Sequence, residues 1–381
     1  MALARYFCEA AITNCDNNIN SERVMGKLYP NKRGAINKDR IFSFSSPCGK
    51  IHFFGVLDGH GKWGHILSEY LCEYFLKFIQ KNFKDMCKNT SKKIRSLFKR
   101  ADIVAFDKLY EHVKNESRHI RIVTNRGWDG CYLESKMYEY SEWEIVSGGS
   151  TCTVVFVNGE KITVGNIGNS DCISIKKDGS FRILTSDHSP TNITEFNRMR
   201  TLSRKKACPH HKYDIRRPSG RMFLKTLGPN IFEKNIFEEK KESSYILCDP
   251  MTVYRKSRIK FSNFYGETYF KNVSGDFATY VVSPDDKSSL AITRSFGDTY
   301  LKVHGISSVP DITEVNLDDG EIIIVATDGH WNSVKKDNFS LEVLEYTNNI
   351  SDLFDKIIRK VEITRNIFGN DCDDTSIIIF K

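Results

Sequence analysis

The chain lacks several features that mark special classes of protein. No stretch approaches the roughly 20 apolar residues that a membrane-spanning helix needs. The start of the chain has no long apolar run after basic residues, so we expect neither a secretory signal nor a membrane partner. Proline is scarce, at 9 of 381 residues, and no internal repeat is present. These absences exclude collagen-like, low-complexity and solenoid architectures.

The 11 cysteines include no CxxC pair, a spacing typical of zinc and redox sites. We therefore expect free thiols in a reducing compartment, cytoplasmic, nuclear or both. The tightest metal-like group is Cys208, His210 and His211, with Cys248 far downstream. Its spacing fits no regular zinc pattern, so an ordinary polar loop is the favoured interpretation.

The chain does have length, apolar content and a localised positive charge. With 381 residues, 40% of them hydrophobic, it can bury a substantial core. Its net charge is +8, and residues 200–287 alone hold 18 Lys and Arg against 10 Asp and Glu, which accounts for the whole excess. No recognisable nucleic-acid-binding motif accompanies this charge, so we expect no nucleic-acid partner.

Short strand-like runs follow one another, separated by turn signals. Residues 41–44 and 51–57 predict a hairpin, and residues 151–157 and 161–165 predict another, with Asn158-Gly159 as its turn. Further strands are predicted at 172–175, 181–184, 290–293, 321–326 and 376–380. Apolar residues at intervals of three and four predict helices over 63–83, 92–115 and 341–361. Strands in runs favour an α+β fold, and residues 1–32 are interpreted as a loose lead-in.

Acidic residues stand at the ends of four predicted strands. Asp58 and Asp328 each follow an apolar run and precede glycine, Asp373 precedes the last strand, and Asp39 precedes the first. Carboxylates converging at one end of a sheet would repel one another unless cations separated them, and oxygen ligands favour Mg²⁺ or Mn²⁺. An ordinary Asp-Gly turn stays an alternative for each position alone, because the sequence does not show that the four meet.

Several ordered blocks resemble the metal-dependent PP2C (PPM) serine/threonine phosphatases. The DGHGKWGH run at 58–65 is similar to the plant-like form of the family's first motif. The resemblance covers about residues 33–381. Its other blocks are 148–151, 164–170, 184–190 with Glu195 and Arg198, 290–298, 309–312, 326–331 and 373–376. It implies a phosphatase domain over 33–381, folded as a PP2C-like β-sandwich of two antiparallel sheets flanked by helices.

The resemblance also implies a reaction and a set of metal ligands. The family hydrolyses phosphoserine and phosphothreonine in proteins with two Mg²⁺ or Mn²⁺ ions. By position, Asp58 would bridge both ions and Gly59 would give its carbonyl to one. Asp328 and Asp373 would hold the other, and Asp39 would bind through water.

His60 would act as general acid for the departing seryl oxygen, because a histidine titrates near neutrality. Arg33 is the candidate for binding phosphate, with Lys32 as its rival. Phosphorylated proteins are the implied substrates, and the basic charge of residues 200–287 would suit acidic phosphopeptides. A monomer is expected.

Three departures from the family pattern bear on the metals. Asn169 and Asn332 stand where the family has Asp residues associated with a third metal site, so we expect that site to be weak or absent. Asp374 replaces the usual Asn. A catalytically inactive scaffold is the alternative to an active enzyme, but retention of Asp58, Asp328 and Asp373 favours activity.

The segment between Asp187 and Leu290 is much longer than in the family, and its part at 200–287 is rich in aromatic residues. It is interpreted as a flap or insertion that either selects and covers substrate or forms a surface loop without a role.

Overall fold

The structure is a computed structural model of the chain. It describes residues 12–14, 18–20, 23–29, 36–46, 48–117, 119–124, 131–189, 192, 194–195, 198–199, 212–215, 259–262, 268–271, 279–282, 288–302, 305–331, 334–346, 349–368 and 373–381.

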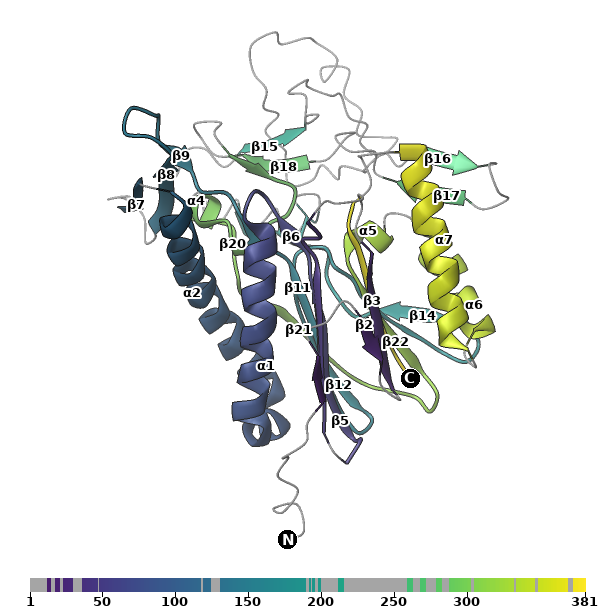
Figure 1. The fold of residues 1–381 in the computed structure, drawn as a ribbon. Coiled ribbons are helices and arrows are strands. Elements are labelled where there is room, and N and C mark those ends of the chain that lie inside the picture. The colour runs from purple at the N-terminus through teal and green to yellow at the C-terminus, as the bar shows by residue number, and fades with distance from the viewer. Residues whose placement is uncertain are drawn as a thin grey trace.

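Two six-stranded antiparallel sheets lie face to face at the centre of the molecule (Figure 1). In spatial order the first contains β1 (Ile12–Asn14), β4 (Arg40–Ser45), β5 (Ile51–Leu57), β11 (Cys152–Asn158), β12 (Lys161–Ile167) and β21 (Asp311–Asn316). The second contains β14 (Phe181–Ile183), β13 (Cys172–Ile175), β22 (Ile322–Ala326), β23 (Thr375–Phe380), β3 (Val24–Tyr29) and β2 (Asn18–Asn20). Both predicted hairpins are confirmed, and Asn158 pairs with Lys161 beside its turn.

Alternation of side chains along the central strands produces three apolar layers. In β5, Phe53 packs on the outer face of the first sheet, whereas its neighbour Phe54 packs between the two sheets. In β22, Ile323 lies between the sheets and Ile324 lies on the outer face of the second. Both strands are therefore covered on both faces, which explains their continuous apolar sequences.

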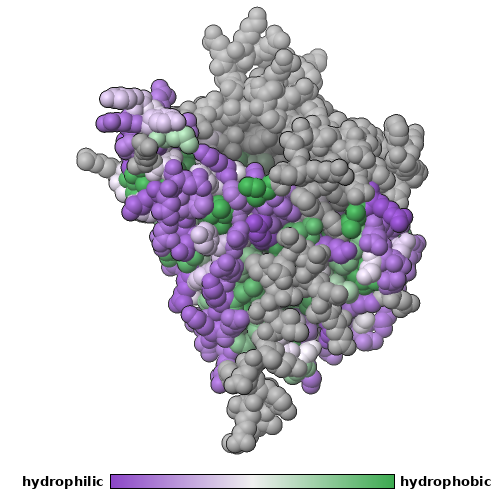
Figure 2. Space-filling view, viewed as in Figure 1, coloured by the Kyte–Doolittle hydropathy of each residue, from purple (hydrophilic) through white to green (hydrophobic). Residues whose placement is uncertain are grey.

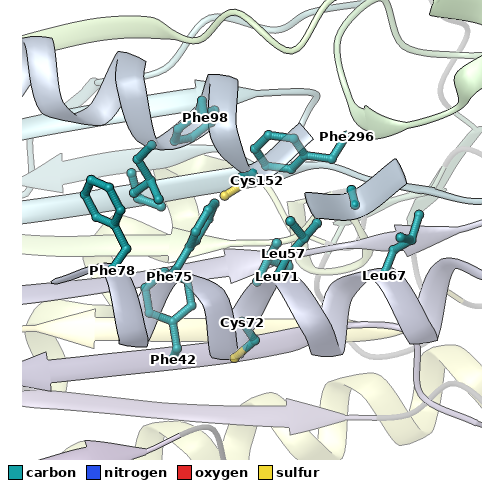
Figure 3. Close-up of a cluster of buried hydrophobic side chains, with 14 of the residues drawn as sticks. Phe42, Leu57, Leu67, Leu71, Cys72, Phe75, Phe78, Phe98, Cys152 and Phe296 are labelled. Carbon is teal, nitrogen blue, oxygen red and sulfur yellow. The ribbon is translucent and has the colours of Figure 1, made fainter. Parts of the chain in front are cut away.

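Helices α1 (Gly64–Lys88) and α2 (Thr90–Glu116) cover the outer face of the first sheet. Figure 3 shows Phe75 of α1 close to Phe98 of α2 and to Phe296, which lies about 200 positions later in the sequence. Each such fully buried ring stabilises the fold by about 1.5–3 kcal/mol. Both predicted helices are confirmed, and both extend beyond their predicted ends.

Helices α5 (Asp328–Trp331), α6 (Lys336–Glu345) and α7 (Ile350–Phe368) cover the second sheet on its outer face. The prediction of one helix over 341–361 is wrong, because the chain turns where the Asn349 N–H donates to the Tyr346 carbonyl. Two consecutive asparagines, poor helix formers, lie at this break. Helices thus flank both sheets, and the predicted α-β-β-α sandwich is confirmed.

Smaller sheets and a short helix accompany the two large sheets. One small sheet contains β20 (Phe296–Gly297), β10 (Gly149–Ser150) and β6 (Gly59–His60), and another contains β7 (His119–Thr124), β8 (Cys131–Lys136) and β9 (Glu144–Ile145). Two further sheets lie in or beside the predicted insertion. One contains β15 (Lys212–Ile215), β18 (Thr279–Val282) and β19 (Ser289–Leu290), and the other pairs β16 (Ile259–Ser262) with β17 (Thr268–Lys271). Helix α4 covers Thr299–Lys302.

Two expectations about local structure need correction. Residues 24–29 of the predicted lead-in form β3, which pairs with β23 along its length because Val24 adds to the apolar layer between the sheets. The strand predicted at 290–293 ends at Leu290, since the Thr293 N–H donates instead to the His188 carbonyl. The rest of the domain division, and the role of residues 200–287, stay predictions.

The cysteines bear out the expectation of free thiols in part. Cys48, Cys87, Cys131, Cys152 and Cys172 are free. Cys72 is disulfide-bonded, so the expectation is wrong for this residue. The zinc-like group at Cys208, His210, His211 and Cys248 lies outside the described residues.

No helix in the described part of the chain combines the length and the apolar character that crossing a bilayer requires. In Figure 2 the coloured surface on the side viewed is mostly hydrophilic, and its hydrophobic residues form small separate groups.

Candidate metal centre and active site

Acidic residues from both sheets meet at one end of the sandwich. Asp39 precedes β4 and Asp58 follows β5 in the first sheet, while Asp328 follows β22 and Asp373 stands shortly before β23 in the second. β4 pairs with β5, and β22 pairs with β23. The structure therefore brings together the four aspartates that the sequence singled out.

A cavity of about 430 Å³ opens at this end of the molecule. Its lining combines polar and acidic residues with an apolar stretch that begins at the end of β19. Its lining contains Ile36, Lys38, Asp58, Gly59, His60, Gly61, Thr151, Asn169, Leu290, Ala291, Ile292, Asp328, Asp373 and Asp374. Asp39 is absent from this lining and lies buried behind it.

Burial and mutual repulsion raise the pKa values of these carboxyl groups. The pKa of Asp58 is raised well above its usual value by burial and then by the charges of Asp39, Asp328 and Asp373. Burial likewise raises the pKa of Asp39. Part of the Asp373 side chain is exposed to solvent. Even so, partial burial of its carboxyl group, followed by the charges of Asp328 and Asp374, raises its pKa to about 7. Such a cluster loses its protons readily only if a cation is bound.

Two carboxylate oxygens support a cation as the missing partner. Asp39 Oδ2 accepts hydrogen bonds from Thr327 Oγ1 at 2.9 Å and Ser376 Oγ at 2.5 Å. In contrast, Asp39 Oδ1 and Asp328 Oδ1 are buried and have no hydrogen-bond partner among the residues that the structure describes. Buried oxygens without a donor are costly, and a hard divalent ion is a ligand that satisfies them.

The carboxylate and carbonyl oxygens at this site are the kind of ligand that Mg²⁺ or Mn²⁺ prefers. Among the described residues, no three or more Asp, Glu, His or Cys side chains already stand in an arrangement that would hold an ion. Binding would therefore require the carboxylates to rotate toward the ions. The charge of Asp328 contributes to the raised pKa of Asp58, so the two carboxyl groups already lie near each other.

Glycines permit the close backbone approach at two points of the site. A Cβ atom at Gly59 would lie 2.6 Å from both the Lys38 and the Gly64 carbonyl oxygens. A Cβ atom at Gly329 would overlap the carbonyl oxygen of Asp374. Any larger residue would push apart the segments that carry Asp58, Asp328 and Asp373.

Asn169 and Asp374 each occupy a defined position in the site. Asn169 Nδ2 donates to Asp328 Oδ2 at 2.8 Å, so the amide takes one of the oxygens that a cation would need. Asp374 Oδ2 accepts from the Lys38 N–H at 2.8 Å, which ties β23 to the segment before β4. Asn332, Lys32 and Arg33 lie outside the described residues.

His60 lies in the cavity lining and contacts Asp298, whose role the sequence did not reveal. The distance from His60 Nε2 to Asp298 Oδ2 is 2.7 Å. Burial opposes a charge on the imidazole, but the Asp298 carboxylate outweighs burial and raises the pKa of His60. Asp298 is the last residue of the family-like block at 290–298, but 238 positions separate it from His60, so nothing in the local pattern connects the two.

A buried cluster of ion pairs holds the segment that contributes Leu290, Ala291 and Ile292 to the lining of the cavity. Glu195 accepts hydrogen bonds from Arg294, Arg198 and Thr293, and Arg294 also pairs with Asp311 at 2.7 Å. Burial opposes ionisation of Glu195, but its two arginines prevail and lower its pKa to about 2. The cluster connects residues on both sides of the predicted insertion and anchors the segment that begins with Leu290.

Comparisons with known proteins agree with this geometry. The family model described as "Protein phosphatase 2C" matches residues 34–204 and 251–348. The chain is 23% identical over 315 residues to a probable protein phosphatase 2C 52 of Arabidopsis thaliana, covering 78% of this chain and 52% of that protein. It is 22% identical to a probable protein phosphatase 2C 65 of the same plant, covering 82% of this chain and 63% of that protein. The chain thus spans between about half and two thirds of the length of these curated relatives.

Solved structures show the same fold. A serine-threonine phosphatase 2C from Toxoplasma gondii superposes with a TM-score of 0.55 at 14% identity, covering 97% of this chain and 98% of that one. Since the family model matches well over half of its residues, the chain belongs to the protein phosphatase 2C family.

Proposed function

We propose that the protein hydrolyses phosphoserine and phosphothreonine in protein substrates with the help of two Mg²⁺ or Mn²⁺ ions. The observation that carries this proposal is the convergence of Asp39, Asp58, Asp328 and Asp373 around a cavity, where two buried carboxylate oxygens have no hydrogen-bond partner in the described part of the chain. Membership of the family supports it.

Within the proposal, each acidic residue has a defined part. Asp58 is close enough to feel the charges of Asp39, Asp328 and Asp373 and would contact both ions, while the Gly59 carbonyl would contact one of them. Asp328 and Asp373 would hold the other ion. Asp39 lies behind the cavity lining, so it would act through water and through its effect on Asp58. When bound, the ions supply the positive charge that activates a water and screens the phosphate.

His60 would serve as the general acid. As the bond from phosphorus to the seryl or threonyl oxygen breaks, its electron pair stays on that oxygen, which takes a proton from the imidazole. His60 lines the same cavity as Asp58 and Asp328, which is consistent with this role. Arg33, or alternatively Lys32, would contact the phosphate before the bond breaks.

The third metal site is proposed to be weak or absent. Asn169 has no negative charge to offer an ion, and its amide already donates to Asp328 Oδ2. That hydrogen bond occupies a carboxylate oxygen with which Asp328 would otherwise contact an additional cation.

We expect the substrates to be phosphoproteins because the chain belongs to the protein phosphatase 2C family. The basic charge of residues 200–287 would favour acidic sequences near the phosphorylated residue. A monomer located in the cytoplasm, the nucleus or both is the proposed working form.

The experiment is a phosphate-release assay on a phosphothreonine peptide with metal-stripped protein and added Mn²⁺. We expect hydrolysis that depends on the metal and is lost in Asp58→Ala, whose fold is checked by circular dichroism. Binding of the peptide without turnover, at every metal concentration tried, would instead indicate an inactive scaffold.

A further inference from the structure

We propose that Asp298 is a positioning residue that holds the His60 imidazole in the orientation needed to protonate the leaving oxygen. This inference rests on the proposed function, because it assigns a partner to the general acid of that reaction. The juxtaposition of His60 Nε2 and Asp298 Oδ2, at 2.7 Å, is its starting point.

The backbone at Asp298 is held in a conformation that aspartate rarely adopts. Its φ angle is 45°, and among the described residues no other non-glycine residue has a positive φ. Such left-handed positions cost about 1–3 kcal/mol and persist where the surrounding structure enforces them, often at functional sites. Here the Asp298 N–H donates to the Gly148 carbonyl at 2.8 Å, which fixes the turn beside β10.

Neighbouring groups aim the Asp298 carboxylate at the imidazole. Ser295 Oγ donates to Asp298 Oδ2 at 2.6 Å, the same oxygen that contacts His60. Phe296, between the two residues in sequence, is fully buried and packs against Phe75 of α1 and Phe98 of α2. The carboxylate therefore belongs to a segment that Phe296 anchors in the core, and the hydrogen bond from Ser295 restricts its orientation.

Gly149 leaves the space in which the two side chains meet. β10, which contains Gly149, lies between β6, which contains His60, and β20, which precedes Asp298. A Cβ atom at position 149 would overlap both Asp298 Oδ2 and His60 Nε2. The contact consequently depends on a glycine in the strand between its two members.

The consequence for the reaction follows from the geometry of an imidazole. A carboxylate that accepts from Nε2 fixes the rotation of the ring and leaves Nδ1 as the nitrogen that faces other partners. Without that contact the ring could rotate about its side-chain bonds, and proton transfer to an alkoxide, a strong base, would slow. An aryl phosphate would suffer less, because phenolates leave without being protonated.

The experiment compares kcat for a phosphothreonine peptide with kcat for p-nitrophenyl phosphate under saturating Mn²⁺. For Asp298→Asn we expect kcat on the peptide to fall by about 10- to 100-fold and KM to change little, while kcat on the aryl phosphate falls by only about 3-fold or less. Gly149→Ala, which keeps both polar side chains but separates them, should change the ratio of the two rates in the same direction.

Asp102→Asn is the matched control. Asp102 accepts a hydrogen bond from Lys302, which also donates to the Ser295 carbonyl, so this carboxylate supports the same segment; among the described residues it forms no hydrogen bond with His60. We expect the control to leave the ratio of the two rates unchanged. Equal losses on both substrates for Asp298→Asn, or a similar change of ratio in the control, would overturn the inference.

His60→Gln separates failure of this inference from failure of the proposed function. If His60→Gln selectively loses peptide hydrolysis and Asp298→Asn does not, the general acid stands and its positioning by Asp298 is wrong. If His60→Gln lowers both rates equally, the general-acid role itself is wrong. The imidazole Nε2–H signal in ¹⁵N–¹H NMR gives a readout independent of turnover: it should be protected from exchange in the wild type and lost in Gly149→Ala.

Discussion

Replacing Glu195 with glutamine should destabilise the protein in a pH-dependent manner. The Glu195 side chain is 1% exposed and pairs with Arg294 at 2.6 Å and Arg198 at 2.8 Å. Its pKa is lowered from 4.5 to about 2. Because one pKa unit corresponds to about 1.4 kcal/mol, its ionised form stabilises the fold by about 3 kcal/mol at neutral pH.

The sign of the pH dependence follows from the depressed pKa. The stabilisation is complete above the unfolded-state value of about 4.5 and is lost as pH falls toward about 2. Urea unfolding should therefore show Glu195→Gln less stable than the wild type by about 3 kcal/mol at pH 7, and the difference should shrink below about pH 4.5.

Glu69→Gln provides the control, since Glu69 pairs with Arg40 at 3.0 Å but its side chain is 56% exposed. Exposed pairs contribute at most about 1 kcal/mol, so this variant should remain close to the wild type. A loss below about 1 kcal/mol for Glu195→Gln at pH 7, or a loss that does not vary down to pH 3, would refute the reasoning.

Two further predictions concern the metal centre. Gly329→Ala should abolish Mn²⁺-dependent phosphate release, because the new methyl group overlaps the Asp374 carbonyl; a variant with wild-type activity would contradict the close approach of these segments. Asn169→Asp should add an ion-binding site, because it removes the amide donor at 2.8 Å from Asp328 Oδ2 and supplies a carboxylate. Calorimetry should then count one more Mn²⁺ per chain than in the wild type, and an unchanged count would argue against the part assigned to Asn169.

The sequence predicted those parts of the fold and site that depend on local patterns. Asp58 and Asp328 stand out because each interrupts an apolar run immediately before a glycine, and the structure brings them to the same cavity. The hairpin of β11 and β12 was recognisable because Asn158-Gly159 favours a tight turn. The helices over 63–83 and 92–115 followed from the spacing of their apolar residues.

Other features depend on contacts between segments far apart in the chain, which no local pattern encodes. The contact between His60 and Asp298 joins positions 238 apart, and that between Asn169 and Asp328 joins positions 159 apart. Strand β3 was missed because its sequence is short and is interrupted by Gly26 and Lys27. Its assignment depends on pairing with β23, more than 300 residues later.

Counting the ions bound by metal-stripped protein tests the central claim most directly. Calorimetric titration with Mn²⁺ should give two ions per chain for the wild type, a large loss of binding at both sites for Asp58→Asn, and loss of one ion for Asp373→Asn. Fewer than two ions in the wild type, or binding by Asp58→Asn that equals the wild type, would contradict a two-metal centre built around Asp58.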